Sequence, residues 1–218
     1  MLKKRLIGVI TVKENQAVQS ISYSKYLPIG SPKLIAENLD RWGVDEIICL
    51  SIDSTRSKNG PNFDLINSIS SLSLSTPLTY GGGIRDSKDA SDVIKSGVER
   101  VVIDNLYQKN NNSIKKISEK IGSQALIISL PVCIDQDKYK IYDYLNKKCF
   151  EINDFIQASL INNYSSEIML IDKNNEGIKN GFQQDLLDNF PLKNKKLIVF
   201  GGLDNIDKIR YVLNKKEV

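Results

Sequence analysis

The sequence contains no histidine, and this absence excludes several kinds of active site. Without an imidazole, the chain cannot form a Ser-His-Asp triad, a Cys-His pair or a zinc site with histidine ligands. Cysteine is scarce as well: Cys49, Cys133 and Cys149 show no metal-type spacing, and an odd number suits a disulfide framework poorly. We therefore expect reduced cysteines, no metal and no cofactor, with acid-base chemistry left to carboxylates, lysine or tyrosine.

Long apolar runs and concentrated charge are also missing. No apolar stretch approaches the roughly 20 residues of a membrane span. The N-terminal segment has neither the long apolar region nor the small-residue cleavage site of an export signal. The net charge of +4 comes from lysines spread along the chain, so it does not indicate nucleic-acid binding. We expect a cytoplasmic protein that binds neither membrane nor nucleic acid.

What the sequence does contain is an internal repeat. The segment from Asp45 to Asp53 is similar to the segment from Ser166 to Asp172, and Glu46 and Glu167 are 121 positions apart. This period is far longer than the roughly 20 to 50 residues of solenoid repeats. Each copy alternates apolar runs with helical patterns, which is typical of a parallel α/β sheet. The repeat therefore predicts a (βα)8 TIM barrel built from two half-barrels, about 1–121 and 122–218.

Short runs of isoleucine, valine and leucine predict parallel strands that are buried on both faces. Seven such runs lie near residues 6–11, 46–52, 78–80, 98–103, 125–130, 167–171 and 197–200. The helix after the seventh run should end near Asn214, shortly before Val218. We therefore expect one domain, residues 1–218, whose barrel is truncated after the seventh βα unit.

Local signals add three smaller predictions. A helix should run from Pro32 to Trp42, with Ser31 as its N-cap and Gly43 just after its end. Tyrosines alternating with lysines over 138–150 indicate a small hairpin inserted after the fifth strand, and 54–61 should be a polar loop.

The active site of such a barrel lies at the C-terminal ends of its strands. The turns Gly81–Gly83 and Gly201–Gly202 could hold phosphate with free backbone N–H groups, or they could serve only as tight turns. Lys13 and Lys179 could contact phosphate or a carboxylate. The carboxylates expected at this end, each of which could instead be a solvated loop charge or a helix cap, are Asp53, Asp104, Asp172 and Glu176.

Taken in order, these motifs resemble the cyclase subunit of imidazole glycerol phosphate synthase, the HisF family. The resemblance runs from residues 4–7 through 81–84, 122–125 and 176–177 to 201–202. It implies a lyase-type subunit of a glutamine amidotransferase complex in histidine biosynthesis. A HisH-like glutaminase would dock at the N-terminal face, and ammonia would cross the barrel to a phosphorylated ribonucleotide. The phosphate-binding residues implied by the match are Gly82, Gly83, Asp104, Asn105, Gly177, Gly201 and Gly202.

At the C-terminal end of the barrel, which we call the mouth, the sequence departs from this family. Its two catalytic aspartates, at the ends of the first and fifth strands, correspond here to Thr11 and Pro131. Neither is a good general base, and losing one typically costs about 10²- to 10⁴-fold in rate. Asp53, Asp172 and Glu176 are the candidates to replace them.

At the opposite end, the match keeps all four charges of the family's ammonia gate, at Arg5, Glu46, Arg100 and Glu167. These residues could instead be salt bridges that seal the barrel base. Because buried charges are costly unless matched, a complete set indicates that this end is still in use.

The sequence is most like a divergent branch of the family that is linked to sugar amidation in surface-polysaccharide synthesis. Members of that branch carry the Thr-Tyr-Gly-Gly-Gly motif found here at 79–83. We therefore expect an ammonia-receiving synthase subunit that acts on a nucleotide sugar or, in histidine biosynthesis, on a ribonucleotide. The alternatives are a noncatalytic pseudoenzyme scaffold that docks and activates a glutaminase, and a truncation product.

Overall fold

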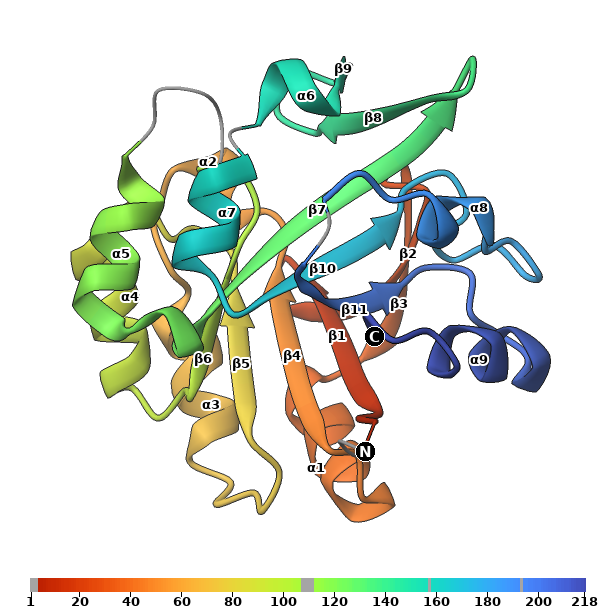
Figure 1. The fold of residues 1–218 in the computed structure, drawn as a ribbon. Helices are drawn as coiled ribbons and strands as arrows, with labels where there is room; N and C mark the ends of the chain where they lie inside the picture. Colours follow the sequence, from red (N-terminus) through yellow and green to blue (C-terminus); the bar gives the residue numbers. More distant parts are fainter. Residues whose placement is uncertain (1–3, 107–111, 157, 193) are drawn as a thin grey trace.

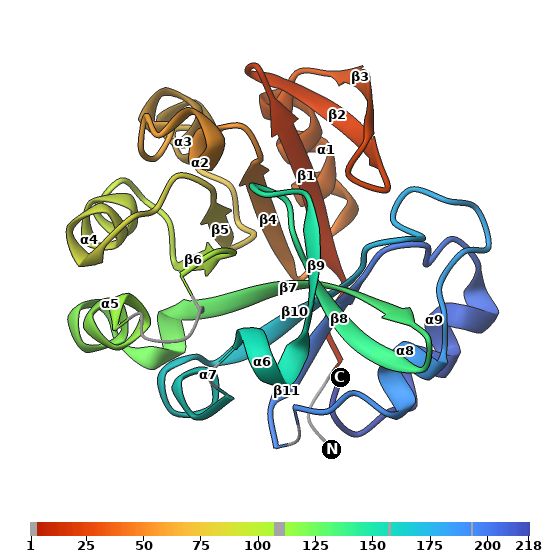
Figure 2. The ribbon, with the colours of Figure 1, turned by 90° about the horizontal axis from the view of Figure 1, so that it is seen from above.

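The computed structural model describes residues 4–106, 112–156, 158–192 and 194–218. Its centre is a curled parallel sheet in which strands follow one another in chain order, as in a TIM barrel (Figures 1 and 2). The seven parallel strands in these residues, which confirm the seven predicted runs, are β1 (Ile7–Lys13), β4 (Glu46–Ser51), β5 (Leu78–Gly81), β6 (Arg100–Ile103), β7 (Leu126–Asp135), β10 (Glu167–Asp172) and β11 (Lys196–Phe200).

Helices cover the outer face of this sheet (Figure 2). They are α1 (Pro32–Trp42), α3 (Phe63–Ser70), α4 (Ser87–Lys95), α5 (Ser113–Ile121), α7 (Ala158–Tyr164), α8 (Asp185–Asp188) and α9 (Ile206–Leu213). Helix α1 has the predicted ends, and Gly43 adopts φ 75° after it. Two details differ from prediction. Ser31 makes no side-chain cap hydrogen bond, and the segment 54–61 begins with a helical turn, α2 (Ser54–Ser57).

Antiparallel strands extend two of the parallel ones. The hairpin predicted after the fifth strand is present as β8 (Lys138–Asp143) and β9 (Lys148–Glu151), followed by α6 (Ile152–Phe155). A second hairpin, β2 (Gln16–Ile21) and β3 (Lys25–Gly30), continues from β1 and was not predicted. The turn that joins β1 to β2 places Glu14 and Asn15 at φ 51° and 62° without the glycine that usually marks such a turn.

Alternation along the strands separates two apolar cores. Ile10 and Val12 of β1 belong to the large core between the sheet and the helices, whereas Ile7 and Val9 pack against the barrel interior. The buried interior residues are Ile48, Val102, Ile127, Met169, Ile171 and Ile198. The inside of the barrel is therefore an apolar space, distinct from the layer beneath the helices.

One side of the barrel is open. In the described part of the chain, β1 and β11 end the parallel order without pairing to each other, and a cleft of about 1420 Å³ lies along them. At the base of the cleft, Leu197 donates its backbone N–H to the carbonyl of Glu217 at 2.7 Å, and the Lys4 ammonium donates to the carbonyl of Lys215 at 2.8 Å. No helix among the described residues is long and apolar enough to cross a membrane.

Candidate functional site

A closed ring of charges lies at the N-terminal end of the barrel. Arg5 bonds Glu46 at 2.9 Å and also bonds Glu167. On the other side, Arg100 contacts Glu46 at 3.2 Å and Glu167 at 2.6 Å. Each member stands two positions before a residue of the barrel interior, so strand alternation turns all four side chains inward. The structure thus joins the four predicted gate residues in one network. We call it the charged ring.

The four residues of the charged ring differ in their exposure to solvent. The Glu46 side chain is 3% exposed, whereas that of Arg5 is 37% exposed, so Arg5 is the member that solvent or a partner reaches. Burial alone would raise the pKa of Glu167. The hydrogen bond from Arg5 and the charge of Arg100 outweigh burial and hold this pKa below its ordinary value. Glu167 is therefore positioned to stay ionised at neutral pH.

Sequence reasoning missed two supporting residues of the ring. The Thr79 hydroxyl, fully buried, donates to Glu46 at 2.5 Å, and Arg100 donates to the Ser166 hydroxyl at 2.7 Å. Thr79 stands opposite Arg100 in the pairing of β5 with β6, and Ser166 directly precedes Glu167, so these two positions were the available signal. These bonds fix the ring geometry beyond the four ion pairs.

At the opposite end, the two family aspartate positions carry uncharged side chains. Thr11 lies at the edge of the cleft, and Pro131 is buried opposite Ile171. Alternation places Pro131 on the same face of β7 as Ile127 of the barrel interior. At the mouth end of the interior, these two positions therefore carry groups that cannot exchange a proton at neutral pH.

Two of the proposed replacement carboxylates hold loops in place. Asp172 is fully buried and accepts from the Asn175 side chain at 3.0 Å and from the Gln183 backbone N–H at 2.9 Å. Asp53 accepts from the Glu14 backbone N–H at 2.9 Å, which links the ends of β1 and β4. These contacts give both residues positioning roles.

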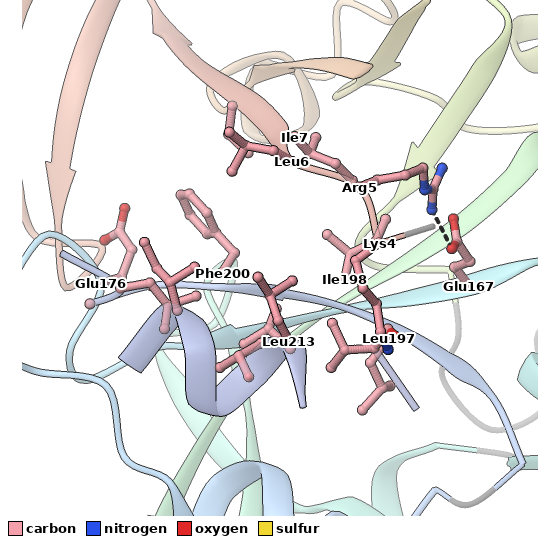
Figure 3. A pocket seen from close by; sticks show the side chains of 18 of the residues that line it. Lys4, Arg5, Leu6, Ile7, Glu167, Glu176, Leu197, Ile198, Phe200 and Leu213 are labelled. Carbon is pink, nitrogen blue, oxygen red and sulfur yellow. Dashed lines mark hydrogen bonds and ion pairs between the residues drawn. The ribbon is translucent and has the colours of Figure 1, made fainter. Parts of the chain in front are cut away.

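Glu176 is better placed for acid-base work. It lies at the mouth end of the cleft, opposite the charged ring, with apolar side chains between the two ends (Figure 3). Its Oε2 accepts from the Ser20 hydroxyl at 3.0 Å and from the Tyr23 backbone N–H at 3.3 Å. Burial raises the pKa of Glu176 above its ordinary value, and these hydrogen bonds oppose the rise only in part. A carboxyl with a raised pKa beside a cleft is suited to general acid or base catalysis.

The raised pKa of Glu176 predicts a pH-dependent effect of Glu176→Gln. The folded protein binds this proton more tightly than the unfolded chain does, so the contribution to stability is full below the ordinary pKa of 4.5 and is lost as pH rises through the folded pKa. We expect the free energy of unfolding of the variant to rise relative to that of the wild type as the pH is raised from 4.5 towards neutral. Urea titrations across this range measure the difference. Glu119→Gln, at an exposed helix position, is the control for the exchange of glutamate for glutamine.

The glycine turn after β5 is packed tightly against a neighbouring loop. A Cβ on Gly82 would lie 2.1 Å from the carbonyl oxygen of Ser51, and one on Gly83 would lie 2.1 Å from that of Gly60. The Gly83 N–H donates to the Thr55 hydroxyl at 2.9 Å. Contact between loops therefore accounts for these glycines, and a bound phosphate would have to displace Thr55 to use the Gly83 N–H.

The other predicted phosphate residues sit in two places. Gly177, Gly201 and Gly202 line the cleft near Glu176. Asp104 and Asn105 follow β6, next to the first glycine turn. Burial raises the pKa of Asp104, whose carboxylate accepts from the Tyr144 hydroxyl at 2.7 Å. The two glycine turns thus lie on different sides of the mouth, as the repeat predicted.

The hairpin β8–β9 lies over the mouth (Figure 2). Tyr142 contacts Tyr23 edge to face at 5.8 Å, and the Lys173 ammonium lies 4.8 Å from the centre of the Tyr142 ring. Arg56 donates to the backbone carbonyl of Tyr144 at 3.1 Å. The hairpin was predicted from the sequence, but its position over the site was not, because long-range contacts set it.

Tyr80, the residue that marks the Thr-Tyr-Gly-Gly-Gly motif, faces the outer core. Its hydroxyl accepts from the Asn62 backbone N–H at 2.9 Å and so anchors the loop before α3. Tyr80→Phe should lower the free energy of unfolding by about 1 to 2 kcal/mol, because the Asn62 N–H loses its partner. Urea denaturation checks this value. Tyr211→Phe, which removes an exposed hydroxyl bond to Asp188, should change stability by less than about 0.5 kcal/mol.

Comparison with known proteins is consistent with this architecture. A family model described as histidine biosynthesis protein matches residues 5–218. A Vibrio vulnificus protein provisionally named imidazole glycerol phosphate synthase subunit hisF2 is 30% identical over 211 residues, 96% of this chain and 77% of the relative. Imidazole glycerol phosphate synthase subunit HisF of an Exiguobacterium species is 26% identical over 217 residues, 99% of this chain and 85% of the relative. The chain therefore belongs to the histidine biosynthesis protein family, within the group that contains the HisF subunits.

Proposed function

We propose that this chain is a HisF-like synthase subunit that receives ammonia from a glutaminase at the charged ring and passes it through the barrel to a substrate at the mouth. One observation carries the proposal: a complete ring of four ion pairs stands directly below an apolar interior. A structural seal alone would not need four charges, since apolar residues of similar size often replace buried ion pairs without loss of stability.

The interior suits ammonia and not ammonium. Its buried side chains are isoleucine, valine and methionine, and taking a cation out of water into such a space costs several kcal/mol. Neutral ammonia avoids this cost. The cleft between β1 and β11 opens the interior sideways, so the isolated chain should lose part of the ammonia to solvent.

For the substrate, we favour a sugar carrying an acetamido group, as in nucleotide-sugar amidation. Asn105 Oδ1 is buried without a hydrogen-bond partner among the described residues, and the Asp104 carboxyl lies next to it in the chain. Both are acceptors, which match the hydroxyl and amide N–H donors of a sugar. A carboxylate at this glycine turn repels phosphate. A phosphorylated part of the substrate would instead bind beside Gly177, Gly201 and Gly202, and Glu176 would exchange the proton.

Glutaminase activation tests the proposal. With a HisH-type glutaminase, the wild-type chain should stimulate glutamate release from glutamine. Arg5→Gln should reduce this stimulation about tenfold, equivalent to about 1.4 kcal/mol of lost interaction. Arg5 is chosen because it is the most exposed ring member. Arg210→Gln, on the exposed face of α9, is the matched control and should behave as the wild type. Unchanged stimulation by a folded Arg5→Gln variant would contradict the proposal.

A noncatalytic scaffold that docks and activates a glutaminase is the second candidate. It is favoured by Thr11 and Pro131, which leave the mouth without the two family aspartates. Turnover with free ammonium separates the candidates, because ammonium bypasses the glutaminase. Product from the histidine-pathway ribonucleotide would indicate a cyclase, and product from an acetamido nucleotide sugar would support amidation. A folded protein that stimulates glutaminase but forms neither product would be a scaffold.

A further inference from the structure

The fold brings two cysteines together that are 16 residues apart in sequence. Cys133 lies on β7 and Cys149 on β9, and their sulfur atoms are 4.0 Å apart. Both strands flank β8, where Cys133 stands opposite Lys140 and Cys149 opposite Tyr142. Residues 140 and 142 are on one face of β8, so both thiols project from the same face of this small sheet.

The two thiols differ in access to solvent. Cys133 is buried, whereas Cys149 is exposed. Burial, followed by the proximity of Cys149, raises the pKa of Cys133 to about 11. A reagent dissolved in water therefore meets Cys149 first, and Cys133 stands behind it as a second sulfur. This is the arrangement of an attacking and a resolving thiol.

We propose that Cys133 and Cys149 form a reversible dithiol-disulfide site that fastens the hairpin β8–β9 to β7. The oxidant is a peroxide. The Cys149 thiolate attacks one peroxide oxygen, the O–O bond breaks, and Cys149 becomes a sulfenic acid while hydroxide leaves. Cys133 then attacks the Cys149 sulfur, an S–S bond forms, and the S–O bond breaks with loss of a second hydroxide. The two thiol protons convert both hydroxides to water, and a small-molecule dithiol reverses the bond.

Closing this bond moves the hairpin. A disulfide needs its sulfur atoms about 2.0 Å apart, so the two must approach by about 2 Å from their separation in the structure. That movement draws β9 toward β7. The segment that follows β8 carries Tyr144, whose hydroxyl bonds Asp104 at the mouth. Oxidation would therefore hold the cover of the mouth in one position, whatever reaction takes place beneath it.

Mass spectrometry of the full chain tests the site. The protein is treated with hydrogen peroxide, unfolded, and alkylated with N-ethylmaleimide. Reduced protein should take up three alkyl groups, since all three cysteines are free. Treated protein should take up one, on Cys49, and a tryptic peptide should link Cys133 to Cys149. Dithiothreitol should restore all three. Three alkyl groups after treatment, a linkage to Cys49, or a dimer joined through Cys149 would overturn the proposal.

Limited trypsin digestion tests the movement. Lys147 ends the hairpin turn and Lys148 begins β9, and oxidation should slow cleavage after these two residues several-fold relative to cleavage elsewhere in the chain. Cys149→Ser is the matched variant: it keeps the hairpin sequence and cannot form the bond, so peroxide should leave its cleavage unchanged. Equal slowing in Cys149→Ser, or a formed disulfide without slowing, would overturn the fastening of the hairpin.

Discussion

Glu46→Gln is expected to lower the free energy of unfolding by about 3 kcal/mol, because removing one partner of a buried ion pair leaves its cations uncompensated. Glu46 is the most buried member of the charged ring and contacts Arg5, Arg100 and Thr79. Glutamine keeps the size of the side chain and removes only its charge. Urea denaturation at neutral pH measures the loss, which would be a large part of the stability of a typical domain.

The matched control is Glu14→Gln. Glu14 pairs with Lys13 on the surface, and its side chain is 77% exposed, so its loss should cost less than about 1 kcal/mol.

A second variant tests the charge argument directly. Removing Arg100 together with Glu46 should cost less than the sum of the single changes, because the pair is then deleted as a unit. Equal effects of Glu46→Gln and Glu14→Gln would show that the ring is not energetically coupled.

Gly83→Ala should destabilise the protein by about 3 kcal/mol or more. Its φ of 72° costs an alanine about 1 to 2 kcal/mol, and the new Cβ would lie 2.1 Å from the carbonyl oxygen of Gly60. The Cβ is fixed to the backbone and the carbonyl oxygen of Gly60 is part of it, so no side-chain rotation can relieve the clash. One of the two loops must move, which typically adds about 1 to 3 kcal/mol. Thermal and urea unfolding measure the change.

Gly43 provides the control for backbone conformation. Its φ of 75° is nearly the same, but no atom lies within 4 Å of an added Cβ. Gly43→Ala should therefore cost only the conformational part, about 1 to 2 kcal/mol. The difference between the two alanine variants isolates the contact with Gly60. If the two costs are equal, the tight packing of the glycine turn does not limit this position.

The sequence predicted those features that depend on local pattern. Strand β4 is apolar from Ile47 to Leu50 and has no exposed residue, and α1 has proline at its start and glycine after its end. The hairpin β2–β3 was missed because neither the turn that joins β1 to β2, at Glu14–Asn15, nor the turn between β2 and β3 contains the usual glycine. The second turn is held by a hydrogen bond from the Ser22 N–H to the Glu176 carbonyl, far away in sequence.

In the candidate site, too, some features followed from local pattern and others did not. The inward direction of the ring residues followed from strand alternation once the strands were known, since Arg100 and Glu167 each stand two positions before an interior residue, Val102 and Met169. The roles of the mouth carboxylates did not follow. Asp172 and Glu176 are four positions apart, yet one is satisfied by loop amides and the other lines a cleft with a raised pKa.

By itself, the sequence determined the order of the seven parallel strands, the hairpin after the fifth of them, and the repeat that makes a barrel. These properties are encoded in short stretches, because burial on both faces and alternation are periodic in the chain. Only the tertiary structure decided which carboxylate lines the cleft, that the barrel is open between β1 and β11, and that Cys133 meets Cys149. Each of these features depends on contacts between segments that are far apart in the sequence, and a local pattern of residues does not specify such contacts.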